Sequence, residues 1–232
     1  MLYRLLLAHV LADFTLQTDY IYRLKTERFR GVLLHVSIVL VTTALFSLPR
    51  FSQWWPYVLF IGLSHIPIDF VKVRLSKLFP KAGIRLFLLD QLAHLLVVVG
   101  AVMIADNLSW KQIAQLLSSP SPDERVVVYC FGYVVSISVG FIFARMVAQN
   151  LAHGGRPVSW STASKYLGMG ERGLATTFVL LSWPYLLPLA IVPRLVLERK
   201  QIRRDGSLLP LAAEVASGLL LAVTVGLMLR GM

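Results

Sequence analysis

The chain contains a single cysteine, Cys130, among its 232 residues. One thiol can form neither an intrachain disulfide nor a thiolate metal site, which excludes a disulfide-stabilised fold and a zinc finger. We expect Cys130 to be a small, buried apolar side chain. Histidine is scarce as well, and five residues are too few for a di-iron desaturase of the eight-histidine kind.

Charged residues are few, at 15%, whereas hydrophobic residues make up 56% of the chain and the mean hydropathy is +0.69. This composition is far from that of soluble domains and predicts an integral membrane protein. Segments of about 17 to 25 apolar residues can cross a hydrocarbon core of about 30 Å. We therefore predict an all-α, polytopic transmembrane bundle of six to seven helices, over residues 2–20, 31–49, 54–72, 86–105, 126–150, 173–197 and 208–230.

These segments leave little sequence for a soluble domain. Residues 1–232 are therefore predicted to form a single integral membrane domain. Within it, a four-helix part at 1–105 precedes an external connection at 106–125, and C-terminal helices follow at 126–232.

Acidic residues are few: the chain has 12 Asp and Glu against 23 Lys and Arg, which gives a net charge of +11. The basic residues cluster at predicted helix ends, so they indicate membrane topology and not nucleic-acid binding. We expect the connections near 23–30 and 72–85 in the cytoplasm of a multi-pass protein of the bacterial inner membrane. Basic residues on both sides of 173–197 do not fit a simple span. The three prolines of this segment favour a broken or re-entrant helix, and a plain violation of the rule is the alternative.

Polar side chains recur inside the predicted helices, where titratable groups are unfavourable and therefore point to function. A His and an Asp four residues apart lie on one face of a helix, one turn from each other. With a rise of about 1.5 Å per residue, these groups reach one polar layer inside the first four helices, roughly 5 to 15 Å from the cytoplasmic boundary. The set consists of His9 and Asp13, His35, His65 and Asp69, and Asp90 and His94.

Imidazole and carboxylate groups without sulfur suit a divalent transition metal. We predict a metal site built from all seven residues, with Zn²⁺ preferred and Mn²⁺ or Fe²⁺ as alternatives. Gln17 and Gln91 are expected to support the ligands by hydrogen bonds. A proton relay without metal and purely structural hydrogen bonding both stay open. The candidate catalytic groups, as general bases or as a proton shuttle, are Asp13, Asp69, Asp90 and His35.

A polar, basic stretch follows the fifth predicted helix. Residues 153–172, HGGRPVSWSTASKYLGMGER, include Arg156, Lys165 and Arg172. Their charges predict contact with an anion such as phosphate or a lipid head group. An ordinary positive-inside connection is the alternative explanation.

Four stretches together resemble a known family. LLLAHVLADFTLQTD, SHIPIDFVK, LLDQLAHLL and the later KYLGMGERGL are similar, over nearly the whole chain, to a bacterial membrane family known only as domain of unknown function 3307. Its AH-x-x-x-DF-x-x-Q opening corresponds to His9, Asp13 and Gln17, and its DQ-x-x-H run to Asp90 and His94. The family implies no established reaction. A looser likeness to membrane metal-dependent hydrolases and to seven-helix zinc ceramidases favours hydrolysis modestly.

We therefore predict metal-dependent hydrolysis of a lipid or lipid-linked substrate from the cytoplasmic leaflet. Membrane lipids are the expected partners, and nucleic acid is not. A transporter of divalent cations or protons that uses the same groups is the first alternative. A non-catalytic membrane subunit, whose polar layer only holds helices together, is the second. An acyl-sized apolar groove beside the site favours the enzyme, whereas access from both sides favours the transporter.

Overall fold

The computed structural model describes residues 1–151, 161–205 and 208–232. Within these ranges every regular element is helical and no strand occurs, which confirms the predicted all-α class. The chain divides into two compact units, Met1–Phe131 and Gly132–Met232. The single domain that we predicted for 1–232 therefore contains two helical units.

Membrane-type helices are present in both units. In the described part of the chain, four helical segments are long and apolar enough to cross a membrane, and the first of them contains two helices joined by a short turn. Helices with the length and hydropathy of membrane spans are thus confirmed, and the number of six to seven spans stays a prediction. The four segments are Phe29–Leu78, Pro80–Ala105, Pro122–Leu151 and Leu208–Arg230.

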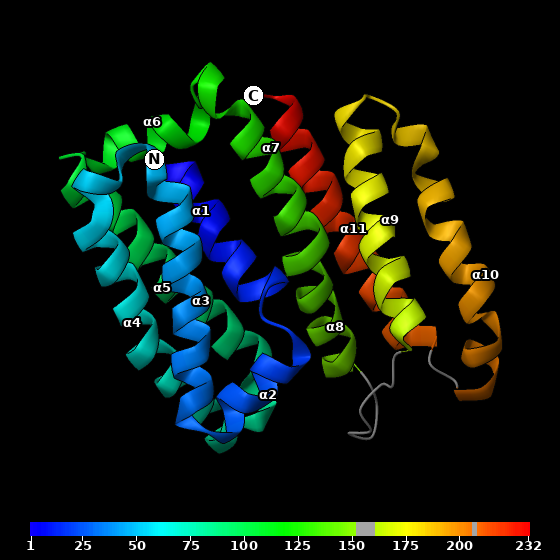
Figure 1. Ribbon diagram of the computed structural model, residues 1–232. Helices are drawn as coiled ribbons and strands as arrows, with labels where there is room; N and C mark the ends of the chain where they lie inside the picture. The colour runs from blue at the N-terminus through cyan, green and yellow to red at the C-terminus, as the bar shows by residue number, and fades with distance from the viewer. Residues whose placement is uncertain (152–160, 206–207) are drawn as a thin grey trace. The chain divides into compact units, whose positions relative to one another are not determined.

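The helices of the first unit pack in neighbouring pairs. α1 contacts α3 and α5, α3 packs against α2 and α4, and α4 packs against α5 (Figure 1). Leu2, Leu5 and Ala8 of α1 are each at most 2% exposed. Because every residue of α1 except Arg4 is buried, His9 on this helix lies away from the surface. The helices are α1 (Leu2–Val10), α2 (Asp19–Glu27), α3 (Phe29–Ser47), α4 (Phe51–Leu78), α5 (Gly83–Ala105) and α6 (Trp110–Ser118).

The helix predicted for residues 2–20 is shorter than expected. α1 ends in a π turn, Leu11–Thr15, and the chain then leaves the helix. The Thr18 hydroxyl accepts a hydrogen bond from the Ile21 amide at 3.4 Å and so caps a new helix, α2. Residues predicted to be a connection therefore form a helix that packs against α3.

The second unit is built around α11, which packs against α8 and α9, while α10 packs against α9 (Figure 1). A second π turn, Val135–Val139, joins α7 to α8. A Cβ atom at Gly226 would lie 2.8 Å from the Cβ of Val179, so glycine permits the close approach of α11 to α9. The helices are the end of α7 (Arg125–Val134), α8 (Gly140–Leu151), α9 (Thr162–Leu180), α10 (Leu187–Asp205) and α11 (Leu208–Arg230).

The segment 173–197 is two helices and not one span. α9 ends at Leu180, Ser182 has a φ of 65°, and a short 3-10 turn, Pro184–Leu186, precedes α10. Proline opens the new turn because it lacks an amide hydrogen and cannot continue a helix. The helix is therefore broken at this position, as the prolines predict.

Cys130 lies on α7 and is exposed, so the prediction of a buried side chain is wrong. α7 belongs to a membrane-type segment. An outward-facing position on such a helix meets apolar surroundings, and an apolar residue can occupy it without burial inside the protein.

Candidate metal centre

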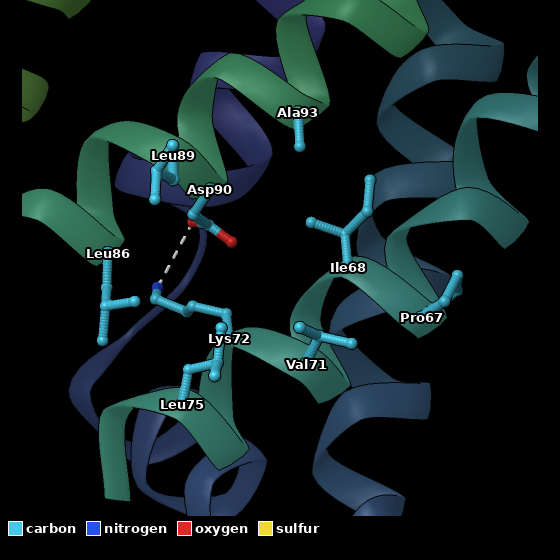
Figure 2. Close-up of a pocket in the computed structure, with 9 residues that line it drawn as sticks. All are labelled: Pro67, Ile68, Val71, Lys72, Leu75, Leu86, Leu89, Asp90 and Ala93. Carbon is cyan, nitrogen blue, oxygen red and sulfur yellow. Dashed lines mark ion pairs between the residues drawn. The ribbon is translucent and has the colours of Figure 1, made fainter. Parts of the chain in front are cut away.

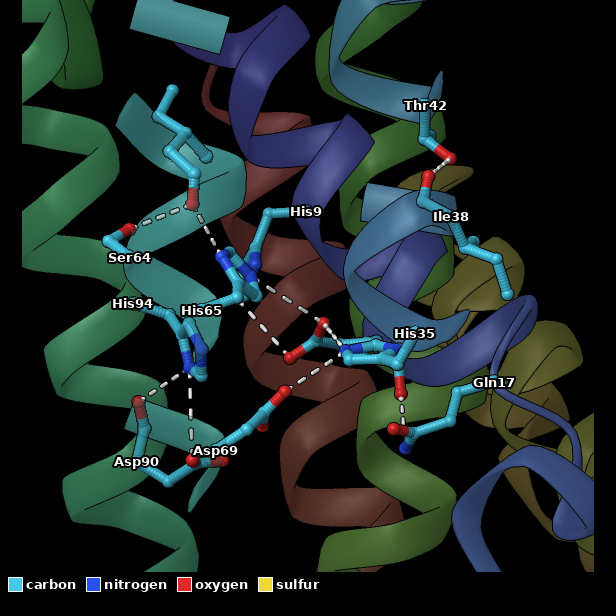
Figure 3. Close-up of polar contacts among 12 residues, drawn as sticks. His9, Gln17, His35, Ile38, Thr42, Ser64, His65, Asp69, Asp90 and His94 are labelled. Atoms are coloured by element: carbon cyan, nitrogen blue, oxygen red, sulfur yellow. Dashed lines mark hydrogen bonds and ion pairs between the residues drawn. The ribbon is translucent and has the colours of Figure 1, made fainter. Parts of the chain in front are cut away.

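All seven predicted ligands are buried within the first unit. His35, His65, Asp69 and His94 are 0% exposed, and the other three are at most 6% exposed. They come from four different parts of the chain, and the six that Figure 3 labels lie together in one cluster. α1 with its π turn carries His9 and Asp13, α3 carries His35, α4 carries His65 and Asp69, and α5 carries Asp90 and His94.

The four imidazole rings form one cluster. The ring centroids of His65 and His94 are 4.2 Å apart, and that of His9 lies 5.2 Å from His94 and 5.5 Å from His65. The His35 ring is 6.3 Å from His65. Residues that are up to 85 positions apart in the sequence therefore meet at one point, because α1 lies between the long helices.

Backbone carbonyls fix the orientation of two of the rings. The Nδ1 atom of His65 donates to the carbonyl of Ile61 at 2.7 Å, and the Nδ1 atom of His94 donates to the carbonyl of Asp90 at 2.9 Å. A carbonyl oxygen can only accept, so each Nε2 carries a lone pair in the neutral ring. Both Nε2 atoms are buried and have no hydrogen-bond partner among the described residues. Two buried acceptors are thus available to a cation.

Asp13 lies among three of the rings. Its Oδ1 atom is 3.2 Å from the Nε2 atom of His35 and 3.9 Å from that of His65, and its Oδ2 atom is 3.9 Å from the Nε2 atom of His9. The π turn carries this carboxylate, and such turns are frequent at functional sites. The donor atoms of His9, Asp13 and His65 lie within 4.8 Å of one another, a spacing that could hold one metal ion.

A second group of donors consists of Asp69, Asp90 and His94, whose ligand atoms also lie within 4.8 Å of one another. Two lysines contact this group, and sequence reasoning missed both as site residues. The Lys25 ammonium donates to Asp69 Oδ1 at 2.7 Å, and the Lys72 ammonium lies 3.4 Å from Asp90 Oδ2. Two of the three carboxylates are therefore paired with lysine, and Asp13 is left without one in the described ranges.

Sequence spacing could have placed one of the two lysines at the candidate site, but not the other. Lys72 follows Asp69 by three residues, so helical spacing places it on the same face. Lys25 comes from α2, and no spacing relates it to the cluster. Its position depends on Gly31, because a Cβ atom there would lie 2.2 Å from the backbone of Leu24. Glycine lets α2 reach α3 closely enough for Lys25 to be buried.

The two predicted supporting glutamines make different contacts. Gln91 donates to Asp90 Oδ2 at 3.1 Å and so touches a candidate ligand directly. Gln17 donates to the backbone carbonyl of Asp13 at 3.1 Å and not to its carboxylate. Gln17 therefore holds the end of the π turn.

A cavity of about 310 Å³ lies between α4 and α5, next to the second donor group (Figure 2). Its walls are apolar, apart from the ion pair of Lys72 and Asp90. The volume is at the lower end of the range for ligand pockets. The lining residues are Pro67, Ile68, Val71, Lys72 and Leu75 of α4, and Leu86, Leu89, Asp90 and Ala93 of α5.

The predicted anion contact belongs to the other unit. Arg156 lies outside the described residues. Lys165 and Arg172 both lie near the Phe141 ring, with the Lys165 Nζ atom 5.7 Å and the Arg172 guanidinium 5.5 Å from its centroid. Arg172 is 0% exposed and Lys165 lies nearer the start of α9, so the two are not side by side on an open surface. Anion binding here stays a prediction.

The second unit also buries a charge network. Arg194 lies 2.8 Å from Glu214, 3.3 Å from Glu198 and 3.5 Å from Glu171. One guanidinium thereby joins α9, α10 and α11. Separating a buried carboxylate from its arginine leaves an unpaired charge in the interior and is unfavourable, so these ion pairs hold the three helices together.

The fold and the site define an all-helical protein of membrane type with a buried histidine and aspartate cluster. A family model described as "Protein of unknown function (DUF3307)" matches residues 1–119, more than half of the chain. The chain belongs to this family. The match is shorter than the resemblance predicted over nearly the whole chain, since it includes every clustered His and Asp but ends before the KYLGMGERGL stretch. No curated protein and no solved structure matches the chain.

Proposed function

We propose that this chain is a metal-dependent membrane hydrolase that acts on a lipid or lipid-linked substrate. The observation that carries the proposal is the pair of buried Nε2 lone pairs on His65 and His94, beside the Asp13 carboxylate that no lysine contacts in the described ranges. Buried acceptors without donors are unfavourable unless a ligand satisfies them. A divalent cation satisfies the lone pairs and the uncompensated negative charge together.

The donor set decides which ion fits. His9, His65 and Asp13 offer two imidazoles and one carboxylate within 4.8 Å of one another, and His94 is adjacent through its contact with both rings. Nitrogen and oxygen donors of this kind favour Zn²⁺, with Mn²⁺ or Fe²⁺ as alternatives. A bound ion of this class supplies Lewis acidity, which polarises a carbonyl or phosphoryl oxygen.

The remaining residues have roles that follow from their contacts. The Nε2 atom of His35 lies 3.2 Å from Asp13 and 3.7 Å from Asp69, so this ring can pass a proton from one carboxylate to the other. The Lys25 ammonium occupies the Oδ1 atom of Asp69 and leaves the Oδ2 atom free to accept that proton. Asp90, next to the apolar cavity, is the carboxylate best placed to meet a substrate.

The cavity between α4 and α5 supports a lipid substrate. Both helices belong to membrane-type segments, and the cavity has the apolar walls that an acyl chain requires. We further propose that the protein lies in the bacterial inner membrane, with six to seven spans and a polar layer inside the first four. The site then opens toward the cytoplasmic leaflet, in agreement with the basic residues at the same helix ends.

One observation favours a second candidate, a proton or cation transporter. His35 bridges two carboxylates, which is the arrangement of a proton relay inside a membrane protein. A transporter requires flux across the bilayer, whereas a hydrolase does not. Proton-flux assays in liposomes therefore separate the two candidates.

The first experiment is metal analysis by mass spectrometry on detergent-purified protein. We expect about one ion per chain in the parent protein and loss of that ion in a His65→Ala/His94→Ala variant. The matched control is His153→Ala, at the fifth histidine of the sequence, which is not among the described residues. Equal metal content in all three proteins, or no metal in the parent, refutes the metal site.

A further inference from the structure

The cavity between α4 and α5 contains two charged side chains of unequal accessibility. The Lys72 side chain is 21% exposed, whereas the side chain of its partner Asp90 is only 3% exposed. Asp90 is also contacted by Gln91 at 3.1 Å. An incoming molecule therefore meets the ammonium group before it meets the carboxylate, and a negatively charged group is favoured at this point.

Lys72 lies near the end of α4, at a depth where its ammonium group can meet the head group of a lipid. Lys72 lies six residues before Leu78, the end of α4, which corresponds to about 9 Å along the helix axis. Further basic residues, Arg74 and Lys77, follow toward that end. A lysine at this depth can extend its ammonium group to the membrane interface while its methylene groups stay on the apolar wall.

The rest of the cavity wall is apolar and suits the acyl chain of a ligand. Ile68, Val71, Leu86 and Leu89 line it, and Val71 and Leu89 are 51% and 61% exposed. In a membrane-type segment, such side chains face acyl chains and not water. The volume of about 310 Å³ is small for a ligand pocket, which favours one chain over two.

We propose that this cavity binds a single-chain anionic amphiphile of the lysophospholipid type, with its phosphate on Lys72 and its acyl chain between α4 and α5. Phosphate replaces Asp90 as the partner of Lys72, and the released Asp90 carboxylate keeps Gln91 and the His94 ring as its polar neighbours. The inference deepens the proposed function by naming its substrate class, and it rests on that function only for the role of the released carboxylate. Lys72 is then a specificity-determining residue.

The test uses metal-free protein in liposomes and two photoactivatable probes with the same acyl chain. One probe is a lysophosphatidic acid and the other an uncharged monoacylglycerol. We expect the anionic probe to label peptides of α4 and α5 about tenfold more than the neutral one, because charge-assisted hydrogen bonds are strong in an apolar environment. Lys72→Gln should bring both probes to the same level, and Lys72→Arg should retain the preference.

Two further variants keep the result interpretable. Lys77→Gln removes an exposed charge from the same helix and should leave labelling unchanged. Ala93→Phe fills the cavity and should abolish labelling by both probes. Equal labelling by the two probes in the parent protein overturns the proposal, as does an equal loss in Lys72→Gln and Lys77→Gln.

The outcome is separable from that of the metal experiment. Because the labelling is done without metal, preference for the anionic probe can be found in a protein that binds no metal. In that case the proposed hydrolase fails and the cavity stands as an anionic lipid site. Metal binding without probe preference gives the opposite result, in which the hydrolase stands and this substrate class is wrong.

Discussion

Replacing Lys25 by methionine should strongly destabilise the first unit. The Lys25 ammonium and the Asp69 carboxylate are 2.7 Å apart, and their side chains are 3% and 1% exposed. At an effective dielectric constant of about 20, two unit charges at this separation attract by about 6 kcal/mol. Methionine retains most of the apolar stem of lysine, so the variant removes the charge with little change in packing.

The loss should be smaller than the attraction itself, because removing the ammonium group also removes its desolvation penalty. What remains is a buried carboxylate without its partner, for which a loss of about 3 to 5 kcal/mol in the free energy of unfolding is typical. Equilibrium unfolding of metal-free protein in mixed micelles, followed by circular dichroism, measures this quantity.

Two comparisons decide whether the reasoning holds. Lys77→Met removes an exposed lysine and should change stability by less than about 0.5 kcal/mol. The double variant Lys25→Met/Asp69→Asn no longer buries an isolated charge and should recover most of the loss. A Lys25→Met protein as stable as the Lys77→Met control would show that the ion pair contributes nothing to the fold.

Three other substitutions give expected outcomes. Asp69→Asn should retain metal and lose turnover, because Lys25 already occupies one oxygen of Asp69; loss of metal on mass spectrometry would make Asp69 a ligand instead. Gly31→Ala should lower the free energy of unfolding by about 1 to 3 kcal/mol, and with it the thermal unfolding temperature, since its Cβ meets the α2 backbone. Gly100→Ala, with open space around the new Cβ, should leave this temperature unchanged. Equal unfolding temperatures of the two variants would contradict the packing argument. His35→Gln should keep the metal and reduce turnover at least tenfold, and full activity would exclude a proton shuttle at this position.

The burial of the candidate residues was predictable because helical spacing constrains it. That they bind a metal stays a prediction. Each pair of His and Asp four residues apart lies on one face, and a polar group in an apolar helix has few favourable positions other than the interior. His65 and Asp69 on α4 illustrate this, since both are 0% exposed. The common membrane depth of these residues, which was derived from helix lengths, stays a prediction.

What could not be predicted depends on local geometry that periodicity does not encode. In the sequence, Lys25 belongs to a group of basic residues that indicates the cytoplasmic side of the membrane. In the structure its exposed fraction is only 4%, because α2 packs closely against α3 at Gly31. The early end of the first helix was missed for a similar reason, since Thr18 caps a new helix within an apparently continuous apolar run. Charge patterns assign a side of the membrane and cannot show that a short helix carries one lysine into the interior.

The π turn at Leu11–Thr15 has a consequence for any attempt to make the first unit more regular. Deleting one residue from it would restore α-helical hydrogen bonding and improve the helix locally. Each residue of an α-helix also turns the chain by about 100°, so the same deletion would rotate Asp13 away from the imidazoles or turn the preceding leucines out of the core. Local helical order and the geometry of the cluster therefore oppose each other at this turn. A variant with a more stable first helix is expected to bind no cation at the proposed site.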